Sequence, residues 1–230
     1  MIKLRAFRAI DDKETCEKFI EGHVKVLIDY GITNITTNKP DWMTNPAIYG
    51  VVAEMEDDNR IVGGIRVHIA NNQYLLPVEE AIGKLDPNIH SLVRMFAQEG
   101  VGELCALWNA KEVAGRGVSV LLLRAGISII NQINLNSLLT ICSDYTMPMV
   151  SKVGFVIERN LGNNGEFVYP NSNYIARVLR KLNAVTLETA HEYDRGRILD
   201  LRQNPVQERM ESGPKGEFLV KYNLIIPPKS

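Results

Sequence analysis

The segment KEVAGRGVSVLLLRA, residues 111–125, constrains the fold of this chain more than any other stretch. Gly115 and Gly117 stand on either side of Arg116, directly before a run of valine and leucine. The residues from 117 to 132 have the length and apolar character of a buried helix. The stretch GELCALW, just before the segment, is apolar enough for an internal strand. Strand, glycine-rich turn and buried helix therefore follow one another here.

The rest of the chain alternates between strand and helix signals without an internal repeat. Asp11 and Glu14 form a capping-box pattern that opens a helix, and Gly31 ends it. Strands are predicted at 1–7, 47–55, 60–70, 102–108, 136–143, 155–159, 166–182 with a break near Pro170, and 216–226; further helices are predicted at 76–87, 88–100, 117–132, 146–154 and 186–201, with loops at 32–47 and 202–215. This order predicts a mixed α/β domain whose sheet is antiparallel at its start and parallel around 102–143.

Composition excludes several classes of function. The 26 basic and 27 acidic residues give a net charge of -1 without a long basic run, so we expect no nucleic-acid partner. The N-terminus lacks the apolar core of a signal peptide, and no stretch is apolar enough to span a membrane. The three cysteines form no close pair and the four histidines are scattered. We therefore expect a cytoplasmic protein without a membrane anchor or a bound metal.

The glycine-rich turn has two interpretations, and its spacing alone leaves both open. Glycine adopts positive φ and lets the backbone approach a ligand, so the helix N-terminus that follows could bind a pyrophosphate. Arg116 would add a charged contact. The alternative is a tight turn before a core helix. Two common phosphate loops are excluded, because no Lys-Ser or Lys-Thr pair follows and Val120 stands where a dinucleotide fingerprint needs its third glycine.

The segment resembles the acyl-coenzyme A site of the GCN5-related N-acetyltransferase (GNAT) superfamily, whose signature is Arg/Gln-x-x-Gly-x-Gly/Ala. Ala114, Gly117 and Ser119 take the three signature positions; Gly117 matches and Ala114 departs from the pattern. A second segment, MVSKVGFVIE, matches the superfamily at Gly154 and Phe155. The two motifs span residues 102–158 at the spacing typical of the superfamily. The resemblance implies a GNAT-like fold.

A fainter resemblance connects the chain to the branch that makes N-acyl homoserine lactones and long-chain N-acyl amino acids. In that branch Gly-Gly-x-Arg precedes Leu-Pro, and a later strand carries Glu-Leu-Ser-Arg. The matching residues here are Gly63, Gly64, Arg66, Leu76, Pro77, Glu103 and Leu104. Ala106 stands where the second motif has its arginine.

The resemblance implies transfer of an acyl group from acetyl-CoA or another acyl-CoA to the amine of a small molecule. The pyrophosphate would lie on Gly115, Arg116, Gly117, Val118 and Ser119, and the pantetheine arm on the backbone of Leu107, Trp108 and Asn109. Trp108 lines the acyl pocket in one interpretation and belongs to the core in the other.

Two side chains are candidates for proton transfer. Glu103 lies in an otherwise apolar strand, where desolvation would raise its pKa towards the range of a general base. The alternative places Glu103 at the solvent-facing start of that strand. Many relatives protonate the departing thiolate with a tyrosine at the position of Val150, and Tyr145 is the nearest substitute here.

Three functions remain open at this stage. The first is an acyl-CoA-dependent N-acyltransferase. The second is a binding or regulatory protein that has kept the fold and lost catalysis, as Ala114 and Val150 suggest. The third is a synthase for long acyl chains carried by CoA or a carrier protein. We expect an acyltransferase core at 1–182 and an extension at 183–230 that packs on the core or exchanges with a partner chain in a homodimer.

Overall fold

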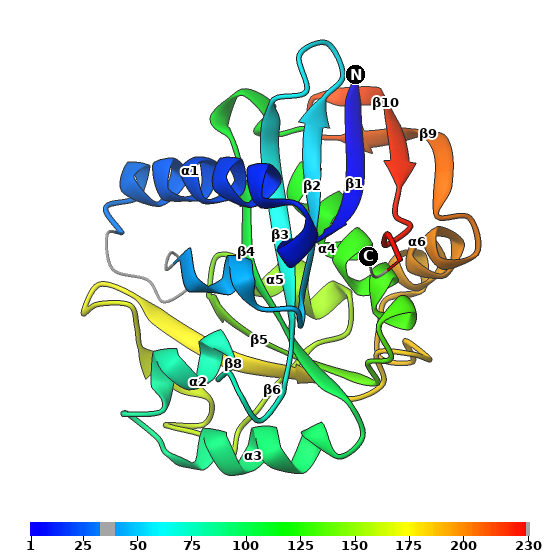
Figure 1. Cartoon of the computed structure of the whole chain (residues 1–230). Helices are drawn as coiled ribbons and strands as arrows, with labels where there is room; N and C mark the ends of the chain where they lie inside the picture. Colours follow the sequence, from blue (N-terminus) through cyan, green and yellow to red (C-terminus); the bar gives the residue numbers. More distant parts are fainter. Residues whose placement is uncertain (33–39, 229–230) are drawn as a thin grey trace.

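The computed structural model describes residues 1–32 and 40–228. Within them, ten strands form one mixed sheet in the order β6-β8-β5-β4-β3-β2-β1-β10-β9, with β7 paired to β8 (Figure 1). The strands are β1 (Ile2–Arg8), β2 (Ile48–Met55), β3 (Ile61–Ile69), β4 (Val101–Asn109), β5 (Ser137–Ser143), β6 (Val156–Ile157), β7 (Glu166–Val168), β8 (Ile175–Lys181), β9 (Val206–Gly213) and β10 (Gly216–Asn223). The mixed α/β fold is confirmed.

Helices cover both faces of the sheet. They are α1 (Lys13–Asp29), α2 (Pro77–Ile82), α3 (Asn88–Ala97), α4 (Val118–Ser128), α5 (Met147–Lys152) and α6 (Glu192–Gln203). The pair Gly63–Gly64 in β3 shows that α1 and α4 lie on opposite faces. A Cβ on Gly63 would lie 3.0 Å from Leu122 of α4, and one on Gly64 would lie 2.3 Å from Phe19 of α1. Glycine at both positions lets the two helices approach the same strand closely.

The first helix begins one residue later than the sequence pattern predicts. Asp12, not Asp11, is the N-cap, and its Oδ1 accepts a hydrogen bond from the amide of Thr15 at 3.1 Å. Asp11 lies in a short 3-10 turn and pairs with Arg8 instead. The capping box with Glu14 is therefore wrong, although the helix itself is confirmed. The ion pair between Arg5 and Asp12, 2.9 Å, fixes this start against β1.

The sheet changes direction in its middle, as the sequence predicts. The pairs β1–β2, β2–β3 and β3–β4 are antiparallel, and β4 then pairs parallel with β5. This parallel pairing includes only Val101–Glu103 on β4 and Ser137–Leu139 on β5. Beyond these residues the two strands continue without pairing to each other. The sheet is thus open between the second halves of β4 and β5.

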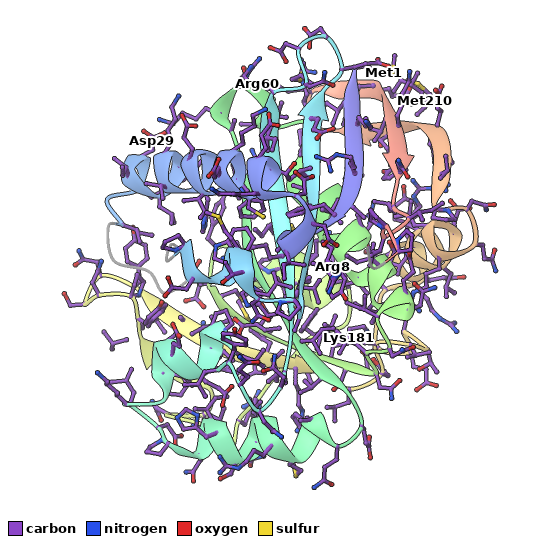
Figure 2. The ribbon with its side chains drawn as sticks, viewed as in Figure 1. Met1, Arg8, Asp29, Arg60, Lys181 and Met210 are labelled. Atoms are coloured by element: carbon purple, nitrogen blue, oxygen red, sulfur yellow. The ribbon has the colours of Figure 1, made fainter. Side chains whose placement is uncertain are left out.

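The C-terminal residues complete the sheet. Strand β10 pairs parallel with β1, and β9, which includes Met210, pairs antiparallel with β10 at the sheet edge (Figures 1 and 2). The sequence pattern missed β9, because VQERMESG is polar and mostly exposed. Both strands pair within this chain, so a homodimer stays a prediction. None of the helices in the described residues is long and apolar enough to cross a bilayer.

Candidate functional site

A cavity of about 250 Å³ lies where β4 and β5 separate. Its walls include the stretch from Glu103 to Leu107 on β4 and the stretch from Thr140 to Ser143 on β5. Leu27 of α1 and Leu123 of α4 line it as well. Because α1 and α4 cover opposite faces, the cavity extends through the sheet rather than lying on one side of it. Most of the lining side chains are apolar.

Glu103 is the acidic group in the wall of this cavity. Its side chain is fully buried, and one carboxyl oxygen accepts a hydrogen bond of 2.7 Å from the amide of Val78. The other oxygen, Oε1, has no hydrogen-bond partner among the described residues. Desolvation raises the pKa of Glu103 to about 8, although the Val78 amide and Arg66 act in the opposite direction. The interpretation of Glu103 as a solvent-facing residue is wrong.

A β-bulge in β4 produces the opening beside Glu103. The pairing with β3 shifts between Gly64 and Arg66, and Ala106 has a φ of 50°, which is unusual for a residue other than glycine. A bulge of this kind bends one strand and increases its twist. It turns β4 away from β5 at the point where their pairing ends.

The bulge also directs backbone amides towards the opening. Ala110 donates its amide to Val62 of β3 at 2.8 Å, and Trp108 pairs with Gly64. Since alternate residues of a strand point their N–H groups to opposite sides, Leu107 and Asn109 point theirs towards β5. Leu107 lines the cavity. Its amide is therefore in position to donate to a ligand there.

The structure does not bring the Trp108 side chain to this cavity. Its indole lies on the α1 side, edge-on to Phe19 with ring centroids 5.8 Å apart, and is only 4 % exposed. A Cβ on Gly22 of α1 would lie 2.1 Å from the indole. Core packing, one of the two interpretations of Trp108, describes this position.

The glycine-rich turn leads into α4 as the sequence pattern indicates. Gly117 is the N-cap with φ 78°, a left-handed conformation that favours glycine. In the described part of the chain, the amides of Gly117, Val118 and Ser119 have no backbone acceptor. The hydroxyl of Ser119 donates to the side-chain oxygen of Asn109, which ties the end of β4 to the start of α4. Three backbone donors thus remain at this helix N-terminus.

The C-terminal hairpin packs against this turn, which the sequence pattern did not reveal. Lys215 donates its amide to the carbonyl of Gly115 at 3.0 Å. The side chain of Lys215 passes close to Gly115, because a Cβ there would lie 3.0 Å from the lysine Cε. Gly213 lies against Arg116, whose backbone would be 2.4 Å from a Cβ on Gly213. Lys215 and Arg116 are both exposed, so the turn carries two cations.

Tyr145 is not placed for a role in this cavity. Its side chain is 89 % exposed in the turn after β5 and is absent from the described residues that line the cavity. Val150 does line the cavity, as an apolar residue. The cavity hydroxyls on β5 and the following turn are those of Thr140, Ser143 and Thr146. Two tyrosines from the β7–β8 connection, Tyr169 and Tyr174, also line the cavity, and their position followed from no sequence signal.

A smaller cavity of about 100 Å³ lies beside the first one, and Pro77 lines both. Arg66 and His68 of β3 and Trp42 form its buried wall, and Asp41 and Glu80 are exposed at its mouth. The guanidinium of Arg66 stacks on Trp42, 4.0 Å from the ring centroid. Among the described residues, no group of three or more potential ligands is placed to hold a metal ion.

Comparison with known proteins identifies the fold but no close relative by sequence. No family model matches the chain, and no curated protein matches it. FeeM, an N-acyl amino acid synthase from uncultured soil microbes, superimposes with a TM-score of 0.58 at 12% identity, covering 81% of this chain and 98% of FeeM. An acyl-CoA N-acyltransferase from Pseudomonas aeruginosa gives 0.53 at 12% identity, with coverages of 79% and 99%.

A third solved structure is an enzyme that makes acyl-homoserine lactones. BjaI, a CoA-dependent acyl-homoserine lactone synthase, gives a TM-score of 0.52 at 12% identity, covering 86% of this chain and 90% of BjaI. At these identities the likeness concerns the fold alone. The chain has the GNAT-like acyl-CoA N-acyltransferase fold that the sequence motifs predict.

Proposed function

Because the chain has this fold, we propose that it transfers an acyl group from an acyl-CoA to an amine. The observation that supports this most is the cavity between β4 and β5, with the buried carboxyl of Glu103 in its wall. A ligand in this opening meets both a backbone donor and a titratable carboxyl. Fold alone does not determine chemistry, so the proposal depends on these groups.

The donor would lie along the α4 side of the opening. The free amides of Gly117, Val118 and Ser119 suit a pyrophosphate, and Arg116 and Lys215 supply positive charge beside them. Lys215 would in this way supply the side-chain contact to the pyrophosphate that Ala114, at the signature's Arg/Gln position, cannot make. The pantetheine arm would then enter the gap between the strands. There the amide of Leu107, which lines the cavity, would donate to the thioester oxygen.

Glu103 would act as the general base. A carboxylate with a pKa near 8 can accept a proton from an alkylammonium ion at neutral to mildly basic pH, which leaves the amine nucleophilic. The amine nitrogen then bonds to the acyl carbon while the carbon–sulfur bond breaks. The proton taken up by Glu103 returns to solvent, and the departing sulfur gains a proton. Glu103 ends the cycle as a carboxylate.

No tyrosine occupies the position from which many relatives protonate the thiolate. Ser143, at the end of β5, and Thr146, one helical turn before Val150, carry hydroxyls in this wall, but the Thr146 hydroxyl already donates to the carbonyl of Ser143 at 3.1 Å. A serine hydroxyl is too weak an acid to give up its proton, but it can donate a hydrogen bond to the sulfur. We propose this role for Ser143, with water as the proton source.

The test combines binding with turnover for acetyl-CoA and decanoyl-CoA. Binding at a hundredfold excess over the dissociation constant should stabilise the protein by about 2.7 kcal/mol, measured by thermal unfolding. Release of free thiol in the presence of a panel of amines measures transfer. Binding without thiol release would favour a protein that has lost catalysis. If neither acetyl-CoA nor decanoyl-CoA binds, and neither releases thiol, the proposal is contradicted.

A second candidate function is transfer of a longer acyl chain. The apolar walls of the cavity, which extends from the α4 side of the sheet to the α1 side, favour it. A long chain would be buried there at about 0.8 kcal/mol per methylene group. Decanoyl-CoA should then bind more tightly than acetyl-CoA. Equal affinity for the two would contradict this alternative and leave the first intact.

A further inference from the structure

Glu103 has to release a proton while both substrates are bound. Its side chain is fully buried, and its pKa of about 8 leaves most of the molecules protonated at neutral pH. The carboxyl must lose this proton before it can act as a base. An acyl chain and an amine in the first cavity would cover Glu103 and exclude water from that side. A route to solvent that bypasses the first cavity is therefore required.

His68 lies opposite Glu103 on the adjacent strand. The two residues pair across β3 and β4, which run side by side (Figure 1). Opposite residues of an antiparallel pair project to the same face, with Cβ atoms about 5 Å apart. Among the described residues, Oε1 of Glu103 and Nε2 of His68 have no hydrogen-bond partner. Ordered water often satisfies buried polar atoms that no protein group reaches, so the pair is placed to share water molecules.

The smaller cavity connects His68 to solvent. His68 and Trp42 line its depth, where they are only 6 % and 7 % exposed, and Asp41 and Tyr74 line it at the surface. Its volume of about 100 Å³ is enough for several water molecules. Nε1 of Trp42 has no partner in the described part of the chain and is a donor for water there. Pro77 lines both cavities, so the smaller one adjoins the first close to Glu103.

The surroundings of His68 keep its ring neutral. Desolvation and the positive charge of Arg66 hold the pKa of His68 well below its usual value. Glu103 faces the ring from β4, and Asp41 and Glu80 line the same cavity at its exposed mouth, where water screens them. A neutral imidazole has one nitrogen that carries a proton and one that accepts a proton. The ring can therefore take up a proton at one nitrogen and release another from the second.

We propose that His68 relays the proton of Glu103 to the smaller cavity while the first cavity holds the acyl-CoA and the amine. Water carries the proton from Oε1 of Glu103 to one ring nitrogen of His68, and the other ring nitrogen gives its proton to water in the smaller cavity. Glu103 becomes a carboxylate, the ring is neutral before and after, and exchange with the same water restores its first tautomer. His68 acts through Glu103 and does not touch the substrates. The inference rests on the proposed function and adds the route by which its base loses a proton.

The first arm of the test compares His68→Gln with the unmodified protein at different pH. Glutamine keeps a donor and an acceptor but does not relay protons. Below pH 8 Glu103 is mostly protonated, so kcat for thiol release should fall by about 10- to 100-fold, with the KM for acyl-CoA unchanged. Above about pH 9 Glu103 is already a carboxylate, so the difference should shrink to about threefold or less. An equal loss of kcat at low and high pH would indicate a structural role and overturn the relay.

The second arm tests chemical rescue. His68→Ala removes the ring and enlarges the smaller cavity, so imidazole added to the buffer can take its place. We expect imidazole to raise kcat of this variant by about fivefold or more below pH 8 and to leave the unmodified protein unchanged. His191→Gln is the control, because His191 is exposed just before α6 and lines neither cavity. Absence of rescue in His68→Ala that is folded by circular dichroism would overturn the relay.

A third arm does not depend on turnover. NMR of the full chain with isotope-labelled histidine follows the exchange of ring N–H protons with water. His23 and His68 are similarly buried, at 5 % and 6 % exposed, but His23 lines only the first of the two cavities. Decanoyl-CoA should slow exchange at His23 by about tenfold or more and change it at His68 by less than about twofold. Equal slowing at both would overturn the relay.

The same measurement separates the relay from the proposed function. If decanoyl-CoA does not bind, the proposed function fails, and exchange at His68 is compared with that at exposed His191 in the protein alone. Exchange within about 100-fold of the rate at His191 would support a water route through the smaller cavity. Slower exchange would overturn it.

Discussion

At the scale of single residues, Glu103 shows what a sequence can and cannot reveal. A lone carboxylate in GELCALW stands out from its apolar neighbours, so the residue was identifiable as a candidate base. Its surroundings could not be identified from the sequence, because Val78, Pro77 and His68 come from other elements that fold onto it. The same limit explains Tyr145 and Tyr174. Distance along the chain favoured the first, whereas the β7–β8 connection brings the second to the cavity.

Replacing Glu103 tests its role as the base. Glu103→Gln keeps an acceptor for the Val78 amide but cannot accept a proton, so kcat should fall by about 100-fold or more. In the unmodified protein the rate should rise with pH to a plateau above about 8, because the active form is the carboxylate. The rise should be lost in the variant. Glu99→Gln, an exposed carboxylate before β4, serves as the control. Equal activity of both variants would refute the assignment.

The same carboxyl should make stability depend on pH. Glu103 has a raised pKa of about 8 when folded and an ordinary value near 4.5 when unfolded, so between these values only the native state holds the proton. Stability relative to Glu103→Gln therefore falls as pH rises across this window, by up to about 1.4 kcal/mol per pH unit. Urea unfolding of both proteins at pH 5, 6.5 and 8 measures the difference, and parallel curves would contradict it.

Ala106 at the bulge carries backbone strain that glycine would relieve. A φ of 50° places its Cβ in an unfavourable position, at a cost of roughly 1 kcal/mol. Glycine relieves this strain but also gives the unfolded chain more conformational entropy, which offsets most of the gain. Ala106→Gly should therefore be neutral or stabilise the protein by about a few tenths of a kcal/mol. Ala125→Gly in the middle of α4 should destabilise it by about 1 kcal/mol or more. The denaturant midpoints of the two variants measure these changes in stability. A similar loss of stability in Ala106→Gly and Ala125→Gly would contradict the presence of strain at Ala106.

At the scale of elements, the β9–β10 hairpin contributes to the glycine-rich turn. The motif around Gly117 could be recognised in the sequence because its spacing is local. The contact of Gly213 and Lys215 with the turn joins residues about 100 positions apart, and no local pattern encodes it. The strand β9 was missed for a related reason, because an exposed edge strand needs no apolar alternation.

Displacing this hairpin should weaken binding of acyl-CoA. A Cβ in Gly213→Ala would lie 2.4 Å from the backbone of Arg116, so the hairpin must move off the turn and take Lys215 with it. We expect about tenfold weaker binding of CoA by calorimetry and a loss of about 1–3 kcal/mol in stability. Gly196→Ala in α6, where an added Cβ meets nothing within 4 Å, is the control and should leave the affinity unchanged. Unchanged affinity in Gly213→Ala would contradict the contribution of the hairpin.

At the scale of the whole molecule, a single sheet joins the first and last strands. The ion pair of Arg124 in α4 with Asp194 in α6, 2.6 Å, ties the C-terminal residues to the helix behind the glycine-rich turn. Arg197, Glu211 and Tyr222 add a buried polar network between α6, β9 and β10. The predicted boundary between 182 and 183 therefore does not separate two sheets. The sequence pattern indicated an extension, but only the pairing of β10 with β1 shows how it joins the core.

This connectivity predicts one cooperative unfolding transition. Trp42 and Trp108 are the two tryptophans, and both lie in the cluster under α1, so their fluorescence reports on the first half of the chain. Far-UV circular dichroism reports on all helices and strands, including α6 and β10. The two urea curves should coincide. A separate transition in circular dichroism alone would show that the C-terminal elements unfold independently.

The parallel pairing of β10 with β1 also has a consequence for biosynthesis. Strand β1 is translated before the other strands of the sheet, but β10, one of its two neighbours, is complete only when translation reaches residue 223. Until then one edge of β1, which carries the apolar residues Ile2 and Leu4, has no partner strand and could pair with another chain. Ribosome-bound chains stalled before residue 216 should therefore recruit chaperones that chains with a folded β10 no longer need.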